Sequence, residues 1–184
     1  MLTFEARSGE QQKGLYDFCC ECKNILGDEK LNIVEIGSYC GSGTMIISDI
    51  FKNSQIMCVD KWEKYVESCS TYDIDRQGLE LKEAEEIFDQ RISKYPNIIK
   101  NKMWSSEFVT TIEDESIDLV YIDGNHDYSF VKKDITYWFP KVKSGAIIGG
   151  HDYGWDTVRS AIADTIGEEP YKTFIDGSWF FIKE

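Results

Sequence analysis

The sequence predicts an α/β fold with an open, mostly parallel sheet, helices on both faces and a C-terminal antiparallel hairpin. Short β-branched or apolar runs alternate with longer amphipathic runs over almost the whole chain, which is typical of strands alternating with helices. Polar residues follow directly after several of these apolar runs. The last two apolar runs are separated only by a short turn around Gly177, which indicates a hairpin.

The size and charge of the chain limit the classes of function. Its 184 residues fit a single domain, 1–184, with a hydrophobic core but no room for two catalytic modules. A formal net charge of -13 without a basic patch disfavours nucleic acid as a partner. No apolar run reaches membrane-spanning length and the first residues lack the pattern of a signal peptide. We therefore expect no membrane partner and a cytoplasmic location.

The elements follow one another in regular order. An amphipathic helix over residues 10–26 lies in an N-terminal helical segment, 1–27. Five parallel strands are expected over residues 31–37, 55–60, 97–104, 117–123 and 144–150. Helices are expected between and after them over residues 44–53, 78–96, 129–142 and 155–169, and the hairpin over 171–176 and 178–184. Residues 62–77 form the longest irregular insertion, which makes them the candidate lid.

A glycine-rich turn, EIGSYCGSGT, joins the first strand to the helix that follows it. Gly37, Gly41 and Gly43 allow the backbone to turn sharply and to approach a ligand closely. Their spacing, G-x-x-x-G-x-G, differs from the G-x-G-x-x-G of dinucleotide-binding turns. Asp60 ends the second strand, where a carboxylate can accept hydrogen bonds from both hydroxyls of a ribose.

Both histidines of the chain lie just after predicted strands. The segment YIDGNHDY contains His126, and the segment GGHDY contains His151. We expect these two strands to be neighbours, so that Asp123 and the His151–Asp152 pair emerge side by side. Carboxylates from adjacent strand ends are suited to hold a divalent cation that also takes substrate oxygens.

These segments together resemble a known group of enzymes. The glycine turn is similar to motif I of class I S-adenosylmethionine-dependent methyltransferases. YIDGNHDY and GGHDY resemble the small-molecule O-methyltransferases that include macrocin, catechol and cephalosporin-hydroxylase types. The resemblance runs from about Gly27 to the C-terminus. It implies a Rossmann-like fold of seven strands and methyl transfer from S-adenosylmethionine to a hydroxyl of a small molecule, such as a sugar or polyketide-like acceptor.

The resemblance also implies roles for individual residues. His126 is the expected general base, and Asp123 could act as the base if no metal is present. The expected ligands of a divalent metal, magnesium or manganese, are Asp123, His151 and Asp152. Tyr128, Tyr153 and Trp155 lie at the same rim and are suited to pack against the acceptor. Contacts to the cofactor are expected from Glu35, Gly37, Ser38, Gly41, Gly43, Thr44, Asp60, Lys61, Trp62, Trp104, Ser105 and Asp123.

His151 departs from this pattern, because the relatives usually present two oxygen ligands after the fifth strand. Magnesium prefers oxygen, whereas imidazole suits manganese, iron or zinc. Either His151 is not a ligand, or the metal is not magnesium, or no metal is used. Two other functions stay open: a nicotinamide-dependent oxidoreductase, which the glycine spacing disfavours, and a non-catalytic cofactor-binding module. Without a large appended domain, the acceptor is either small or shared with a second subunit of a homo-oligomer.

Overall fold

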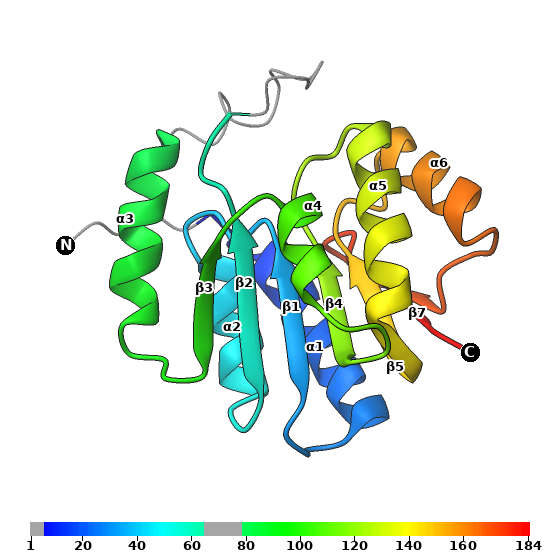
Figure 1. The fold of residues 1–184 in the computed structure, drawn as a ribbon, viewed down its shortest axis with the longest axis horizontal. Helices are drawn as coiled ribbons and strands as arrows, with labels where there is room; N and C mark the ends of the chain where they lie inside the picture. Colours follow the sequence, from blue (N-terminus) through cyan, green and yellow to red (C-terminus); the bar gives the residue numbers. More distant parts are fainter. Residues whose placement is uncertain (1–5, 65–78) are drawn as a thin grey trace.

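The computed structural model describes residues 6–64 and 79–184, in which one sheet lies between two layers of helices (Figure 1). The strand order is β3-β2-β1-β4-β5-β7-β6, and β7 runs antiparallel to both of its neighbours, β5 and β6. The strands are β1 (Asn32–Ile36), β2 (Gln55–Asp60), β3 (Ile98–Lys102), β4 (Ile117–Ile122), β5 (Val142–Gly150), β6 (Lys172–Thr173) and β7 (Trp179–Ile182).

The helices divide between the two faces of the sheet. One face is covered by α1 (Glu10–Leu26), α2 (Ser42–Ile50) and α3 (Leu81–Ile92). The other face is covered by α4 (Ser105–Phe108), α5 (Tyr128–Trp138) and α6 (Asp156–Thr165), with 3₁₀ turns at Val109–Thr111 and Phe139–Lys141. None of the described helices is long and apolar enough to cross a membrane.

The central strands are buried on both faces because their side chains alternate between the two helical layers. Ile33 of β1 packs in the cluster formed with α1, α2 and α3, whereas the adjacent Val34 packs in the cluster formed with α4, α5 and α6. Leu119 and Val120 of β4 divide in the same way, and all four side chains are fully buried. This burial explains why the sequence shows continuous apolar runs rather than a polar–apolar alternation.

The predicted fold, a mostly parallel seven-stranded sheet with a C-terminal antiparallel hairpin, is confirmed. The helix over 10–26 and the strand over 55–60 have the predicted bounds. The helix predicted over 78–96 ends earlier, at Ile92, where the amide of Tyr95 closes a turn back onto the Ile92 carbonyl before Pro96. The candidate lid, 62–77, lies outside the described residues from residue 65 onward.

The strand order decides where a ligand can lie. Starting from β1, the chain builds β2 and β3 on one side and β4 and β5 on the other. In open α/β sheets, ligands bind beyond the carboxyl ends of the strands at the point where this order reverses. The residues that follow β1 and β4 meet at this point, because the amide of Asp123 donates to the Ile36 carbonyl at 2.8 Å.

Candidate active site

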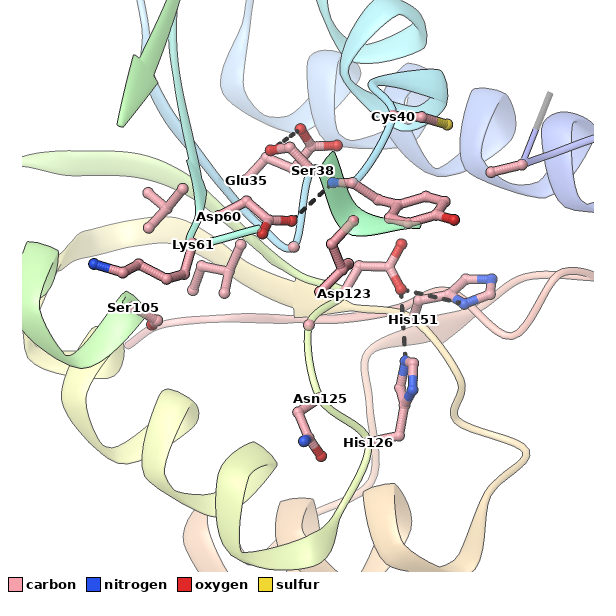
Figure 2. Close-up of a pocket in the computed structure, with 18 of the residues that line it drawn as sticks. Glu35, Ser38, Cys40, Asp60, Lys61, Ser105, Asp123, Asn125, His126 and His151 are labelled. Atoms are coloured by element: carbon pink, nitrogen blue, oxygen red, sulfur yellow. Dashed lines mark hydrogen bonds and ion pairs between the residues drawn. The ribbon is translucent and has the colours of Figure 1, made fainter. Parts of the chain in front are cut away.

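A cavity of about 380 Å³ opens at the carboxyl ends of the parallel strands (Figure 2). Its size is that of a small-molecule pocket. Most of the residues that the sequence predicts for the site line it: Glu35, Gly37, Ser38, Gly43, Asp60, Lys61, Trp104, Ser105, Asp123, His126, His151, Asp152 and Trp155. Arg7 and Asn125, which were not predicted from the sequence, line it as well.

The glycine turn after β1 is shaped by two different requirements. Gly37 has a positive φ of 86°, and a Cβ atom there would lie 2.1 Å from the carbonyl oxygen of Asp123. Only glycine allows the β1 and β4 ends to approach so closely. Gly41 caps α2 in a left-handed conformation and does not line the cavity. Its role is therefore to shape the turn, and the predicted cofactor contact does not follow from its position.

Glu35 lies beneath this turn with only 2% of its surface exposed. Its Oε2 accepts hydrogen bonds from Ser38 Oγ, at 2.7 Å, and from Thr44 Oγ1. Thr44 is fully buried and does not line the cavity, so it acts on the site only through Glu35. Burial raises the pKa of Glu35 to about 7, although the two hydroxyl donors and the charge of Arg7 favour the ionised form.

The raised pKa predicts a pH-dependent stability. The folded chain holds the Glu35 proton up to about pH 7, whereas the unfolded chain releases it near 4.5. The stability gained from this proton is complete below pH 4.5 and is lost as the pH rises through 7. Glu35→Gln cannot ionise. Its free energy of unfolding should therefore exceed that of the wild type by up to about 3 kcal/mol at pH 8.5 and by little at pH 5.

Urea denaturation at both pH values measures this difference. Glu113→Gln is the control, because Glu113 is exposed and lies outside the cavity. An equal effect of Glu35→Gln at pH 5 and pH 8.5 would show that the folded carboxyl titrates normally.

Asp60 holds the two segments that follow β1 and β2 together. Its Oδ2 accepts from the Tyr39 amide at 2.9 Å, and its Oδ1 accepts from the Trp62 amide at 2.7 Å. The carboxylate lines the cavity, and each oxygen keeps a second lone pair for a ligand hydroxyl. Trp62 instead turns into the core: it is 5% exposed, and its ring centroid lies 5.0 Å from that of Phe88. Trp62 does not line the cavity, so the predicted contact with the cofactor does not follow from its position.

Ser105 begins α4 and lies next to Trp104 at the cavity wall. Its Oγ donates to Oδ1 of Asp134 at 2.6 Å and accepts from Nε1 of Trp138 at 2.8 Å. Burial raises the pKa of Asp134 to about 6. With its hydrogen committed to Asp134, the Ser105 hydroxyl can offer the cavity only an acceptor.

Two histidines and two aspartates from the β4 and β5 ends converge on one centre. Figure 2 shows His126 and His151 directed toward Asp123. Nε2 of His126 lies 2.7 Å from Oδ2 of Asp152 and 3.7 Å from Oδ1 of Asp123. Nδ1 of His151 lies 3.0 Å from the same Asp152 oxygen and 3.7 Å from the same Asp123 oxygen. Asp152 reaches this position from a left-handed backbone conformation, φ 59°, which is uncommon for a residue other than glycine.

Two charged residues that carry no local sequence signal complete this cluster. Nη2 of Arg7 pairs with Oδ2 of Asp123, and Nη1 lies 3.7 Å from Oδ2 of Asp176. The Asp176 side chain is fully buried, and Nε2 of His151 lies 3.5 Å from its Oδ2. In the sequence, Asp176 looks like an ordinary turn residue of the hairpin, and Arg7 stands alone before the first helix.

The pKa values in the cluster follow from these contacts. Burial alone would lower the pKa of His151, but the charge of Asp123 and the bonds to Asp152 and Asp176 outweigh it and raise this pKa to about 9. Burial favours neutral carboxyls, yet the neighbouring Arg7 and imidazoles hold the pKa values of Asp123 and Asp152 below their usual range. The aspartates are therefore ionised at neutral pH, and His151 is protonated.

The residues spaced for a metal differ from the predicted set. Asp123, His126 and Asp152 each offer a ligand atom within 4.8 Å of the others. His151 was expected as the third ligand, but its two ring nitrogens face Asp152 and Asp176. One imidazole with two carboxylates would suit manganese, iron or zinc better than magnesium.

The three aromatic residues predicted to pack against the acceptor take different positions. Trp155 lines the cavity, and its ring centroid lies 5.2 Å from that of His126. Tyr128 and Tyr153 do not line the cavity. Their hydroxyls donate to Asp164 and Glu169, Tyr128 from the first position of α5 and Tyr153 from the turn between β5 and α6. Only Trp155 is placed to contact an acceptor.

Comparison with known proteins identifies the family. Residues 34–153, more than half of the chain, match the model of a methyltransferase domain family. The chain is 26% identical over 126 residues to the uncharacterized protein y4gI of Sinorhizobium fredii. This match covers 65% of the chain. The chain spans only 13% of the length of that relative.

Solved structures show the same fold. The O-methyltransferase TomG from Streptomyces achromogenes, in complex with S-adenosylmethionine, superposes with a TM-score of 0.64 at 11% identity, covering 97% of this chain and 82% of TomG. Aeropyrum pernix fibrillarin with natively bound S-adenosyl-L-methionine superposes with a TM-score of 0.58 at 12% identity, covering 93% of this chain and 75% of fibrillarin. The family match spans both the glycine turn and the two histidine segments. The chain therefore belongs to the methyltransferase domain family and has the fold of the class I S-adenosylmethionine-dependent methyltransferases.

Proposed function

We propose that this protein transfers a methyl group from S-adenosylmethionine to a hydroxyl of a small-molecule acceptor, such as a sugar or a polyketide-like compound. The observation that carries the proposal is a single cavity with two different ends. One end holds the glycine turn, Glu35 and Asp60, and the other holds Asp123 and His126. A donor bound at the first end would present its methyl group to the second.

The first end has the groups that this cofactor needs. The Asp60 carboxylate would accept hydrogen bonds from the ribose hydroxyls, and Ser105 and Trp104 would lie beside the adenine. Gly37 lines the cavity without a side chain, so the backbone of the turn would be accessible to the cofactor. Glu35 would supply a negative charge beneath the positively charged methionine part, and that cation would favour ionisation of the carboxyl.

The second end has the groups that the reaction needs. The methyl group of a sulfonium is already activated, so the protein must align the acceptor oxygen with it and remove a proton. The oxygen forms a bond to the methyl carbon as the carbon–sulfur bond breaks, and the hydroxyl proton passes to the imidazole of His126, at the ring nitrogen other than Nε2, because Nε2 donates to the ionised Asp152. Asp152, at 2.7 Å, and Asp123, at 3.7 Å, would stabilise the imidazolium that results.

A divalent cation could assist the same step in another way. Held by Asp123, His126 and Asp152, it would lower the pKa of the acceptor hydroxyl. The spacing of the three residues fits a cation, but a neutral imidazole that binds a metal through one nitrogen carries its hydrogen on the other and cannot accept a proton. The general base and the metal ligand are therefore competing roles for His126, and we assign it the first.

Two features favour this function over its alternatives. The family match favours methyl transfer over nicotinamide-dependent redox chemistry. The net charge of -13 and the size of the cavity favour a small acceptor over nucleic acid. A non-catalytic module of the same fold would bind the cofactor but would not turn it over.

Calorimetry tests the cofactor, and label transfer tests the reaction. We expect saturable binding of one equivalent of S-adenosylhomocysteine and no binding of NAD. Tritium from the methyl group of S-adenosylmethionine should then appear in members of a panel of catechols, sugars and phenolic polyketides. Binding of NAD without binding of S-adenosylhomocysteine would refute the proposal, and cofactor binding without transfer to any panel member would favour the non-catalytic module.

A further inference from the structure

The acidic cluster at the reactive end is already in contact with a fixed positive charge. Arg7 is only 9% exposed, and its guanidinium lies between Asp123 and Asp176. The Asp123 oxygen that it contacts is Oδ2, whereas Oδ1 faces both histidines. The carboxylate expected to bind a metal is therefore engaged by arginine on one side and by imidazoles on the other.

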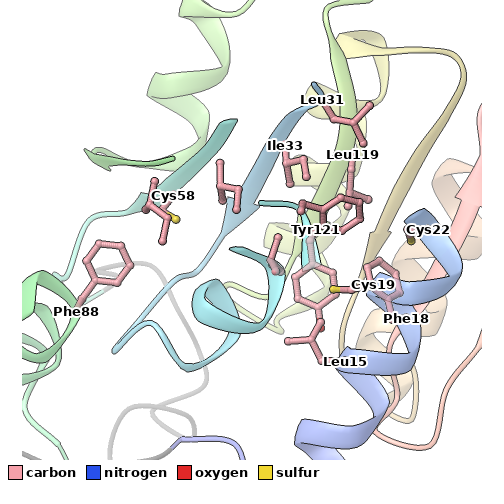
Figure 3. Packing of buried hydrophobic residues seen from close by; sticks show 14 of the residues in the cluster. Leu15, Phe18, Cys19, Cys22, Leu31, Ile33, Cys58, Phe88, Leu119 and Tyr121 are labelled. Atoms are coloured by element: carbon pink, nitrogen blue, oxygen red, sulfur yellow. The ribbon is translucent and has the colours of Figure 1, made fainter. Parts of the chain in front are cut away.

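The protein holds Arg7 in this place from several directions. The amide of the preceding Ala6 donates to Ser42 Oγ at 3.2 Å, at the start of α2. Nη2 of Arg7 also lies 3.5 Å from the buried hydroxyl of Tyr121. The helix α1, which follows Arg7, is fixed to the sheet through Phe18, whose ring centroid lies 5.0 Å from that of Tyr121 (Figure 3).

Asp176 fixes the far side of the guanidinium. The carboxylate accepts from both the amide and the hydroxyl of Ser178, at 2.9 and 2.8 Å. It also packs directly on α1, where a Cβ atom at Gly14 would lie 2.3 Å from Asp176 Cγ. Gly14 is thus a point of α1 that admits this carboxylate, and Arg7 is held between the half-buried Asp123 and the buried side chain of Asp176.

This arrangement has a consequence for metal binding. A divalent cation on Asp123 would share that carboxylate with a buried guanidinium a few ångströms away. Like charges at this separation repel, and the repulsion is stronger beside a buried guanidinium than in bulk water. Arg7 contacts Asp123, Tyr121 and Asp176 and is only 9% exposed, so it has little freedom to withdraw.

We propose that Arg7 is the resident cation of the transfer site and that it keeps a divalent metal off the Asp123, His126 and Asp152 group. The inference rests on the proposed function, because it names the cation that balances the carboxylates during methyl transfer. The aspartates then serve to position His126 and to stabilise its protonated form, and transfer proceeds without added metal.

Titration with Mn²⁺, followed by calorimetry and by loss of the free-ion electron paramagnetic resonance signal, tests the inference. The wild type should show no saturable site at submillimolar Mn²⁺. Arg7→Gln, which removes the charge, should bind one Mn²⁺ at least tenfold more tightly, whereas Arg7→Lys, which keeps it, should resemble the wild type. Lys141→Gln removes a charge that pairs with Asp114 away from the cavity, and it should not alter Mn²⁺ binding.

Two further measurements complete the test. Adding Asp152→Asn to Arg7→Gln should abolish the new site, which places the metal on the predicted group. Saturable Mn²⁺ binding by the wild type at micromolar concentration would overturn the inference, and this measurement needs no variant to fold. Equal affinities in the wild type and a folded Arg7→Gln would overturn it as well. S-adenosylhomocysteine binding, measured on the same samples, reports separately on the proposed function.

Discussion

Replacing His126 with glutamine should slow methyl transfer by about 10²- to 10⁴-fold, the range that a positioned general base contributes. The affinity for S-adenosylhomocysteine should stay nearly unchanged, because the cofactor end of the cavity is built from the residues that follow β1, β2 and β3. Glutamine fills much of the same space and can still donate to Asp152, but it cannot accept a proton near neutral pH. The expected loss is therefore in kcat rather than in binding of the cofactor.

The measurement is tritium transfer to whichever acceptor the wild type methylates, together with calorimetry of S-adenosylhomocysteine. Tyr128→Phe is a suitable control, since that hydroxyl bonds to Asp164 outside the cavity and its loss should not alter the rate. Turnover by His126→Gln at the rate of the wild type would remove the imidazole from the mechanism.

The sequence predicted the framework of the site because parallel strands end at one edge. The apolar runs located the strands, and the polar residues after them, such as Asp60 and Asp123, had to meet at the carboxyl edge of the sheet. Glycine spacing in the turn was equally informative, since Gly37 is required by a backbone contact that nothing else could accommodate. These features depend on local pattern and on topology, which a single sequence records.

Long-range side-chain contacts were not predictable in this way. Arg7 meets Asp123 across 116 positions of the chain and meets Asp176 from the opposite terminus. No local spacing marks either residue. Their pairing depends on how closely α1 approaches the sheet, and that depends in turn on Gly14, which looked like an ordinary helical residue.

The orientation of side chains at strand ends could not be predicted from the sequence either. Trp62 is only two residues from Asp60, and the sequence therefore suggested a contact with the cofactor. Its backbone has a positive φ of 52°, and its ring packs on Phe88 instead. The two His-Asp pairs look equivalent, but only the pair around His126 places its imidazole in the group spaced for a metal. The two pairs differ because Asp152 adopts a left-handed backbone conformation and because His151 contacts Asp176. Neither feature can be predicted from the residue types.

Gly37→Ala should destabilise the protein by about 3 kcal/mol or more, the largest effect expected of any single methyl group at this site. The added Cβ would lie 2.1 Å from the carbonyl oxygen of Asp123 and 2.7 Å from Cα of Gly124. Both are backbone atoms, and β1 and β4 are fixed in register by the bond from the Asp123 amide to Ile36. Relief would require the two central strands to separate, which would also distort the turn that the cofactor is proposed to contact.

The matched control is Gly145→Ala. Gly145 also has a positive φ, 77°, but a Cβ atom there would meet nothing within 4 Å. Alanine at Gly145 should therefore cost only the left-handed backbone penalty, about 1 kcal/mol. Urea denaturation of both variants separates the two contributions, because the difference between them isolates the close approach of β1 to β4. Equal losses of stability would mean that these strand ends can move apart at little cost, and the case for a rigid turn beneath the sulfonium donor would fail with that result.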